Sequence, residues 1–242
     1  MDSMIRVRDV KAAQGASWMR GGWDLFRRRP AAWAGFALGW LAVTFGLILV
    51  PLIGGVIANF LQPVFFASFA IAARKQLAGE NVEMGDLFSG FRRNTRALIN
   101  VGALQLLAGV GIVVLMDALG LPQMTSTGDQ LPNLVDYVQQ LDGNEWILLV
   151  GFVLLAAVKG ALWFTPPLLA FHDLTTAHAI RWSVYAALSN FGALLVYGAT
   201  LMIVFFVATI PWGLGLAIAI PVMLASTYIG YTEVFEETPA EG

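Results

Sequence analysis

The sequence AAWAGFALGWLAVTFGLILVPLI, residues 31–53, contains no charged side chain. A helix needs about 20 predominantly apolar residues to cross a hydrocarbon core of about 30 Å, so this segment is long enough to span a bilayer. Five further segments qualify in the same way: 55–73, 97–119, 146–170, 191–211 and 213–232. The sequence therefore predicts an all-α, polytopic membrane helix bundle with six transmembrane helices.

The composition agrees with a membrane protein. Of the 242 residues, 58% are apolar and 12% are charged, and the mean hydropathy is +0.72. Soluble domains contain about 25% charged residues, so an ordinary cytosolic enzyme is excluded, as are a disordered chain and a secreted disulfide scaffold. The absence of cysteine removes disulfides, thiolate catalysis and Cys-ligated metal sites.

The basic residues indicate the orientation of the spans, because short loops rich in Lys and Arg stay cytoplasmic. All Lys and Arg residues except Lys159 lie before the first span, between the second and third, or between the fourth and fifth. The loop 121–145 contains acidic residues and no basic ones, and residues 236–242 form a short acidic tail. We expect both termini to be cytoplasmic and the loop 121–145 to lie outside.

An internal repeat is visible in the second helix of the hairpins. The segment PVFFASFAI (63–71) matches PVMLASTYI (221–229), and PLLA (167–170) is a fainter third copy. Amphipathic stretches precede the first, third and fifth spans, and such helices can lie in the membrane plane. We therefore predict a single membrane domain, 1–242, of three parallel repeats, each an interfacial helix and a hairpin. The repeats cover about 10–76, about 82–172 and about 174–235.

Each repeat carries proline in its second helix. Proline frees a backbone carbonyl and bends the helix, and a neighbouring helix or water must then satisfy that carbonyl. Three bent helices could meet at a centre and line a path for a small solute, although close packing alone explains the same pattern. The candidate kinks are Pro63, Pro166, Pro167 and Pro221.

Lys159 is the ionisable residue well inside an apolar run, and such a residue is a functional hypothesis by default. If the helix 146–170 is continuous, Lys159 lies near the midplane and needs polar neighbours. If the helix breaks at the prolines, Lys159 lies about 9 Å from the inner end and can extend to the interface. The repeat offers a third register, at the outer end. The candidate neighbours are Gln105, Asn59 and Gln62.

The basic residues before the third span would face an inner leaflet whose anionic lipids attract each such charge by about 1 kcal/mol. They predict contact with anionic headgroups or with a protein partner, although the same charges also serve as the orientation signal. Nucleic acid is not expected, because the chain is acidic overall and shows no nucleic-acid-binding motif. The predicted cluster consists of Arg20, Arg27, Arg28, Arg29, Arg74, Lys75, Arg92, Arg93 and Arg96.

No catalytic motif is visible. The sequence contains no Walker loop, no Gly-rich dinucleotide turn, no G-x-S-x-G and no H-E-x-x-H. His172 and His178 are six positions apart and point in different directions on a helix, so a metal site is not expected. We therefore expect no enzymatic activity, no cofactor and no bound metal.

Several motifs resemble a known family. They are GWDLFRRRP (22–30), DLFSGFRRN (86–94), WFTPP (163–167) and FHDL (171–174). Together they are similar to the uncharacterised BPSS-type family of six-span proteobacterial inner-membrane proteins, over nearly the whole chain. The resemblance implies a six-helix fold and a location in the bacterial inner membrane, and it supplies no activity.

Two functional hypotheses remain after these observations. The first is a non-enzymatic inner-membrane protein that contacts lipids or a partner through its basic cytoplasmic face. The alternative is a small transporter or channel with a path between the proline-bearing helices. Homo-oligomerisation is compatible with either hypothesis.

Overall fold

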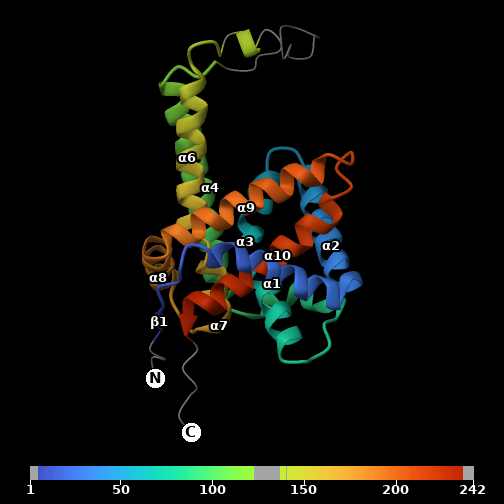
Figure 1. Cartoon of the computed structure of the whole chain (residues 1–242). Helices are drawn as coiled ribbons and strands as arrows, with labels where there is room; N and C mark the ends of the chain where they lie inside the picture. Colours follow the sequence, from blue (N-terminus) through green and yellow to red (C-terminus); the bar gives the residue numbers. More distant parts are fainter. Residues whose placement is uncertain (1–4, 123–136, 140, 237–242) are drawn as a thin grey trace. The chain divides into compact units, whose positions relative to one another are not determined.

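The computed structural model of the chain describes residues 5–122, 137–139 and 141–236. Within these residues, six helices are long and apolar enough to cross a membrane, and each coincides with a predicted segment. The prediction of six such helices is confirmed (Figure 1). They are Pro30–Ile48 (α2), Gly54–Leu77 (α3), Thr95–Ala118 (α4), Glu145–Phe171 (α6 and α7), Phe191–Thr209 (α9) and Leu216–Val234 (α10).

A shorter helix precedes each pair of long helices. These are α1 (Gln14–Arg28), η1 (Met84–Arg92) and α8 (Thr176–Ser189). Two of them are α-helices, whereas η1 is a 3-10 helix, which the sequence pattern did not indicate. Its buried residues, Leu87 and Gly90, are three positions apart, which matches the three residues per turn of a 3-10 helix.

The chain divides into two compact units. Unit 1 comprises Met1–Ala103 and Ala161–Gly242, and unit 2 comprises Leu104–Gly160. In unit 2, a Cβ on Gly151 of α6 would meet the Met116 sulfur of α4, so these helices pack closely. Most of the predicted outer loop 121–145, and nearly all of the tail 236–242, lie outside the described residues. The prediction of a single membrane domain stays a prediction.

In unit 1 the first and last described segments of the chain lie side by side (Figure 1). Strand β1 (Arg6–Val7) pairs antiparallel with β2 (Phe235–Glu236). The Asn190 side chain holds the segment after β1, since its Oδ1 accepts from the Val10 N–H at 2.7 Å and its Nδ2 donates to the Arg8 carbonyl at 3.0 Å. The described ends therefore lie on one side of unit 1.

Helix α1 packs closely across α10. A Cβ on Gly22 would lie 2.5 Å from the Val222 carbonyl oxygen, 2.6 Å from the Ser226 Cβ and 2.8 Å from the Ser226 amide nitrogen. Gly15 lies near the start of the same helix. A Cβ on it would meet the backbone of α9 at Ala193 and Tyr197. Glycine is required at Gly22 because any side chain would push against the backbone of α10.

Helix η1 packs on α3 in a similar manner. A Cβ on Gly90 would meet the Val64 carbonyl oxygen, and the Gly90 amide donates to the Ser68 hydroxyl at 2.9 Å. Val64 and Ser68 hold the same places in PVFFASFAI that Val222 and Ser226 hold in PVMLASTYI. The two matching segments therefore each contact a glycine of a short helix at equivalent positions.

The core of unit 1 also contains a buried polar connection between three helices. The Trp33 indole N–H donates to the Gln76 Oε1 at 2.7 Å, and the Gln76 Nε2 donates to the Leu25 carbonyl at 2.9 Å. Leu25 lies in the last turn of α1, where carbonyls have no partner within the helix. Gln76 therefore caps α1 and fixes the start of α2 against the end of α3.

The predicted kink residues lie in two kinds of setting. Pro63 lies inside α3 and Pro221 inside α10, whereas Pro166 and Pro167 begin the short helix α7 (Thr165–Phe171) after a break that follows α6 (Glu145–Ala161). All four prolines are buried. The span Glu145–Phe171 is therefore not one uninterrupted helix, because residues 162–164, between α6 and α7, form turns.

The break is closed by a side chain of α8. The Ser183 hydroxyl donates to the Ala161 carbonyl at 2.7 Å and accepts from the Phe164 amide at 3.1 Å. Ser183 has no exposed surface. One buried hydroxyl thus replaces helical hydrogen bonds on both sides of the break.

Candidate functional site: a basic pocket in unit 1

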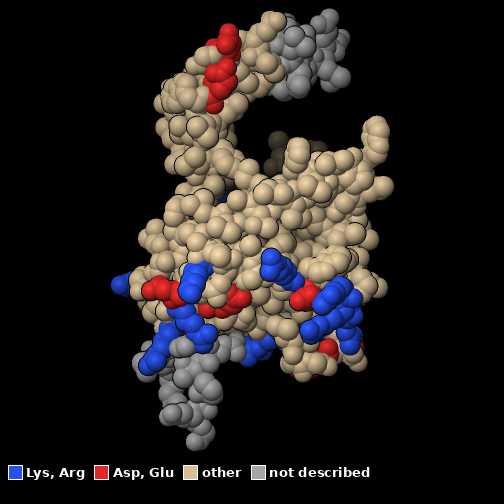
Figure 2. Space-filling view, in the orientation of Figure 1, with Lys and Arg blue, Asp and Glu red and all other residues tan. Residues whose placement is uncertain are grey.

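The basic residues of unit 1 gather at one end of it. In Figure 2 the Lys and Arg side chains lie near the end that carries the described termini, and the opposite end shows none on the visible face. The hairpin turns there expose apolar side chains instead, since Leu52 is 98% and Trp212 is 97% exposed. On this face, unit 1 therefore has one charged end and one end without Lys or Arg side chains.

Most members of the predicted basic cluster are exposed. Arg27 pairs with Asp24 at 3.0 Å, and Arg29 donates to the Asn81 side chain at 2.7 Å. Arg20, Arg28, Arg92, Arg93 and Arg96 are exposed, and the structure shows no carboxylate within salt-bridge distance of them among the described residues. The structure brings part of the cluster to one pocket and leaves the rest spread over the charged end.

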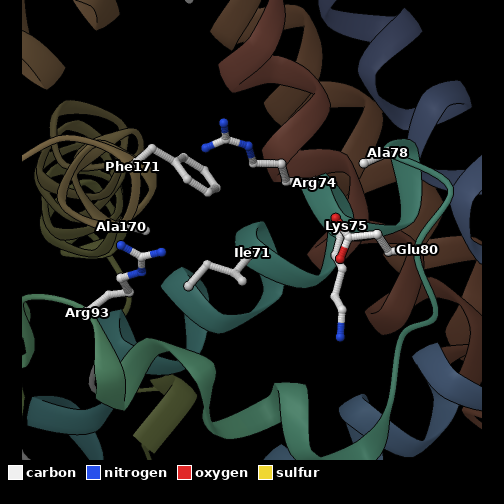
Figure 3. A pocket seen from close by; sticks show the side chains of 8 residues that line it. All are labelled: Ile71, Arg74, Lys75, Ala78, Glu80, Arg93, Ala170 and Phe171. Carbon is white, nitrogen blue, oxygen red and sulfur yellow. The ribbon is translucent and has the colours of Figure 1, made fainter. Parts of the chain in front are cut away.

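The pocket has a volume of about 380 Å³ and lies between α3, α7 and the segment after η1 (Figure 3). Three members of the predicted cluster line it, and Glu80 is the carboxylate among its lining residues. Apolar side chains form the remaining wall. The lining residues are Ile71, Arg74, Lys75, Ala78, Glu80, Arg93, Ala170 and Phe171.

Arg74 is positioned by an aromatic ring. Its guanidinium carbon lies 4.9 Å from the centre of the Phe171 ring, a distance that fits a cation–π interaction. The ring is itself held by Tyr228 and Tyr231, each with its ring centre 5.5 Å away. The Tyr231 hydroxyl lies 2.8 Å from the His172 Nε2. This aromatic cluster gives the Arg74 head a fixed place at the pocket wall.

Arg93 is placed by the backbone around it. Its amide donates to the Gly90 carbonyl at 3.2 Å, which ends η1. The next residue, Asn94, has a φ of 39° and donates from its side chain to the Leu174 carbonyl at 2.9 Å. Asn tolerates the left-handed region better than most residues, so the sharp turn after Arg93 is accessible. The turn carries Arg93 to the pocket.

Lys75 serves a different purpose from the two arginines. Its Nζ lies 3.1 Å from both carboxylate oxygens of Asp86, which joins the end of α3 to η1. Figure 3 shows the Lys75 side chain extending away from Phe171, whereas the Arg74 and Arg93 side chains lie near it. The pocket therefore combines basic side chains with an apolar wall of Ile71, Ala170 and Phe171.

The intramembrane candidates separate into two groups. In unit 2, the Lys159 Nζ donates to the Gln105 Oε1 at 3.3 Å, as the sequence suggested. Lys159 lies in the last turn of α6, just before the break, which agrees with the broken-helix alternative. Asn59 and Gln62 belong to α3 of unit 1, where the Asn59 side chain donates to the Gly55 carbonyl at 2.9 Å. A role for Lys159 in transport stays a prediction.

Sequence reasoning missed several residues of the site. Phe171 lies in the quoted motif FHDL, but nothing in the pattern showed that its ring would face Arg74, more than ninety positions earlier. Glu80 and Ile71 gave no signal of their own. Among the described residues, no group of three or more His, Asp or Glu side chains could hold a metal.

One curated relative decides the family. A probable inner membrane protein of Burkholderia thailandensis is 31% identical to this chain over 233 residues, which cover 93% of this chain and 84% of the relative. The chain belongs to the family of this inner membrane protein. Since the family relationship covers nearly the whole length and the six apolar helices are present, the chain is an integral membrane protein.

Other comparisons add nothing to this relationship. No protein-family model matches the sequence, and no solved structure matches it. The membrane family shown by the relative agrees with the membrane family that the motifs resemble, although the BPSS-type label itself stays a prediction.

Proposed function

We propose that this chain is a multi-pass, non-enzymatic protein of the bacterial inner membrane whose charged end binds anionic phospholipid headgroups at the cytoplasmic surface. The observation that carries the proposal is the gathering of the unit 1 basic residues at one end (Figure 2). Each Lys or Arg near an anionic surface contributes about 1 kcal/mol of attraction. A set of exposed arginines without carboxylate partners among the described residues thus favours a layer of anionic lipid around the protein.

The same charges support a cytoplasmic position for both termini, since basic loops stay on that side. The uncharged opposite end, with Leu52 and Trp212 exposed at its turns, suits the outer interface, where tryptophan is enriched. The relative's name, a probable inner membrane protein, supports the choice of membrane.

The proposal includes three parallel repeats of one short helix and one hairpin. Two observations support it: the element order places α1, η1 and α8 before successive pairs of long helices, and Gly22 and Gly90 contact equivalent positions of the two matching segments. The short helix of the third repeat, α8, makes a different contact. Its Ser183 hydroxyl bonds the backbone at the break after α6, where α1 and η1 use a glycine. Repetition would spread the arginines of the repeats around one end of the molecule.

The first test addresses the orientation. The chain has no cysteine, so single cysteines can be labelled without background. We expect Asp142→Cys to react with a membrane-impermeant maleimide added to intact spheroplasts, and Asp173→Cys to react only after permeabilisation, because only a water-exposed thiolate reacts well. Both residues are exposed in the structure. The reverse pattern would place the termini outside and contradict the proposal.

The second test addresses lipid binding. Replacing Arg20, Arg28, Arg92 and Arg96 by glutamine removes four exposed charges and leaves the arginines of the pocket in place. We expect the ratio of anionic to zwitterionic phospholipid that co-purifies in mild detergent to fall about twofold or more, because the lost attraction is about 1 kcal/mol per charge. Lipids are quantified by mass spectrometry after extraction.

A matched control removes one positive charge far from these arginines in sequence. Lys159→Gln lies in unit 2, outside the charged end of unit 1, and is expected to leave the lipid ratio unchanged. An unchanged ratio in the fourfold variant, or an equal change in the control, would contradict binding of anionic lipid by the charged end.

A further inference from the structure

We propose that the C-terminal half of α8 (Thr176–Ser189) is an anchor in the membrane surface. The Tyr185 and Leu188 side chains enter the acyl region, and Arg181 lies among the phospholipid headgroups. The partner of this exposed face is then the bilayer that the protein spans. The inference rests on the proposed function for the side of the membrane and makes it specific, because it adds an apolar anchor to the charges that contact the headgroups.

The large exposed side chains of α8 form one face of the helix. Successive members are three or four positions apart, which places them on the same side. The opposite side is buried against the rest of unit 1, where the Ser183 hydroxyl bonds the backbone at the break after α6. This contact fixes how α8 is rotated about its axis. The exposed face carries His178, Arg181, Tyr185 and Leu188.

The polarity of this face changes along the helix. Arg181 lies in its first half, whereas residues 182–191 contain no charged side chain. Tyr185 is 56% and Leu188 is 71% exposed. The Trp182 and Tyr185 rings lie in contact, with their centres 6.1 Å apart and their planes at 81°. Tryptophan and tyrosine are enriched at membrane interfaces, because each combines an apolar ring with a polar group. The gradient from Arg181 to Leu188 thus matches the passage from headgroups to acyl chains.

The connection to α9 sets the depth of this face. Helix α8 ends at Ser189 and the span α9 begins at Phe191, so only Asn190 separates them (Figure 1). The Asn190 amide donates to the Ala186 carbonyl at 3.0 Å, and its carbonyl accepts from the Leu194 amide at 3.0 Å. The Cα atoms of Leu188 and Phe191 cannot be more than about 11 Å apart. Since Phe191 starts a span, Leu188 lies at the edge of the bilayer.

The bilayer accounts for both halves of the face. An interfacial helix buries its apolar side about 5–10 Å into the boundary between headgroups and acyl chains. Arg181 can then donate to phosphate oxygens, while Tyr185 and Leu188 lose contact with water. Phe191 is 60% exposed and belongs to the lipid-facing surface of α9. Acyl chains that cover Phe191 also reach Leu188, so the face is covered without a further protein.

The test measures depth with single nitroxide labels. The chain has no cysteine, so Tyr185→Cys and Leu188→Cys can each be labelled at one site. The full chain is placed in lipid nanodiscs of phosphatidylcholine and phosphatidylglycerol, which leave both membrane surfaces open to water. Electron paramagnetic resonance then compares collisions of the label with oxygen, which dissolves in acyl chains, and with a nickel complex, which stays in water.

Two exposed positions provide the reference values. Asp173→Cys lies before α8 and is expected to collide mainly with the nickel complex, and Leu195→Cys, in α9, mainly with oxygen. We expect the oxygen-to-nickel ratio at Leu188 to be several-fold higher than at Asp173 and close to that at Leu195. The ratio at Tyr185 should lie between the two references. All four side chains are exposed, so the labels leave the core of unit 1 undisturbed.

The outcomes separate the anchor from the proposed function. A ratio at Leu188 equal to that at Asp173 places the face in water and overturns the anchor. Low collision rates with both reagents show that protein covers the face, for example a second copy of this chain, and they overturn the anchor as well. If Leu188 resembles Leu195 while the fourfold arginine variant keeps its anionic lipid, the anchor stands and the proposed lipid preference is overturned.

Discussion

Replacing Ser183 by alanine is expected to lower the free energy of unfolding of the detergent-solubilised protein by about 2–4 kcal/mol. The substitution removes the hydroxyl that donates to the Ala161 carbonyl and accepts from the Phe164 amide. Both backbone groups lie at the break between α6 and α7 and are left without this partner. A buried unsatisfied group costs about 1–3 kcal/mol. The Phe164 amide becomes such a group, and the part-buried Ala161 carbonyl adds to the loss.

The measurement is thermal unfolding followed by tryptophan fluorescence. We expect the midpoint to fall by about 5–15 °C. Ser189→Ala is the matched control, since Ser189 is the last residue of the same helix, α8, and is exposed. A midpoint within about 1 °C of the unaltered protein for Ser183→Ala would mean that the break does not depend on the hydroxyl.

Replacing Gly22 by alanine is expected to be the second most damaging change. The new methyl would lie 2.5 Å from the Val222 carbonyl oxygen and 2.8 Å from the Ser226 amide nitrogen. Because two of its three nearest atoms are backbone, α10 has to move, and no side chain can rotate to relieve the contact. Ser226 also lies 2.6 Å from the Tyr197 hydroxyl, so moving α10 strains that hydrogen bond as well. Overpacking of this kind costs about 1–3 kcal/mol.

A helical glycine in open space offers the control. A methyl on Gly198, inside α9, would meet nothing within 4 Å. Alanine also favours the helix by about 1 kcal/mol relative to glycine. We expect Gly198→Ala to change the midpoint little and Gly22→Ala to lower it by about 3–10 °C. Equal behaviour of the two variants would show that α1 does not approach α10 this closely.

A second glycine pair extends this comparison to η1. A Cβ on Gly90 would meet the Val64 carbonyl oxygen, whereas Gly85 has nothing within 4 Å. Gly90→Ala should therefore resemble Gly22→Ala, and Gly85→Ala should resemble Gly198→Ala. A large effect at Gly22 with none at Gly90 would count against equivalent packing of the two short helices.

The six spans were predictable from the sequence because apolar length alone determines whether a helix can cross a bilayer. The segment 31–53 became Pro30–Ile48, and the segment 191–211 became Phe191–Thr209. Helix ends were less predictable: the turn after Ile48 retains Leu52, which is apolar but lies outside the helix with a φ of 68°. Hydropathy does not distinguish a residue in a turn from one in a span.

The site was only partly predictable. Charge placement identified Arg74, Lys75 and Arg93, because basic residues in short loops stand out against apolar spans. It gave no indication that Phe171 contacts Arg74, because a phenylalanine in a membrane protein can pack against many apolar side chains. Pairings of distant segments, such as Arg74 with Phe171, depend on the three-dimensional packing and leave no periodic trace in one sequence.

Ser183 illustrates the same limit in another way. A serine in a helix that precedes a span reads as a surface residue, because serine is usually exposed. Ser183 matters because a different helix breaks beside it. The prolines 166 and 167 indicated that this helix could break, but they did not indicate which side chain would bond the freed backbone groups. The break and its partner can be recognised together only when α7 and α8 are seen side by side.

The pairing of the chain ends has a consequence for how the protein is made. Helix α1 is synthesised before α2, α3, α4, α6 and α9, and α10, across which it packs, is synthesised after them. Chains usually fold from the N-terminal part as they emerge. Here α1 cannot pack against α10 until five other spans have been synthesised. A nascent chain that stops before α10 carries an unfinished first helix, so truncation late in synthesis should expose the earliest segment to proteolysis.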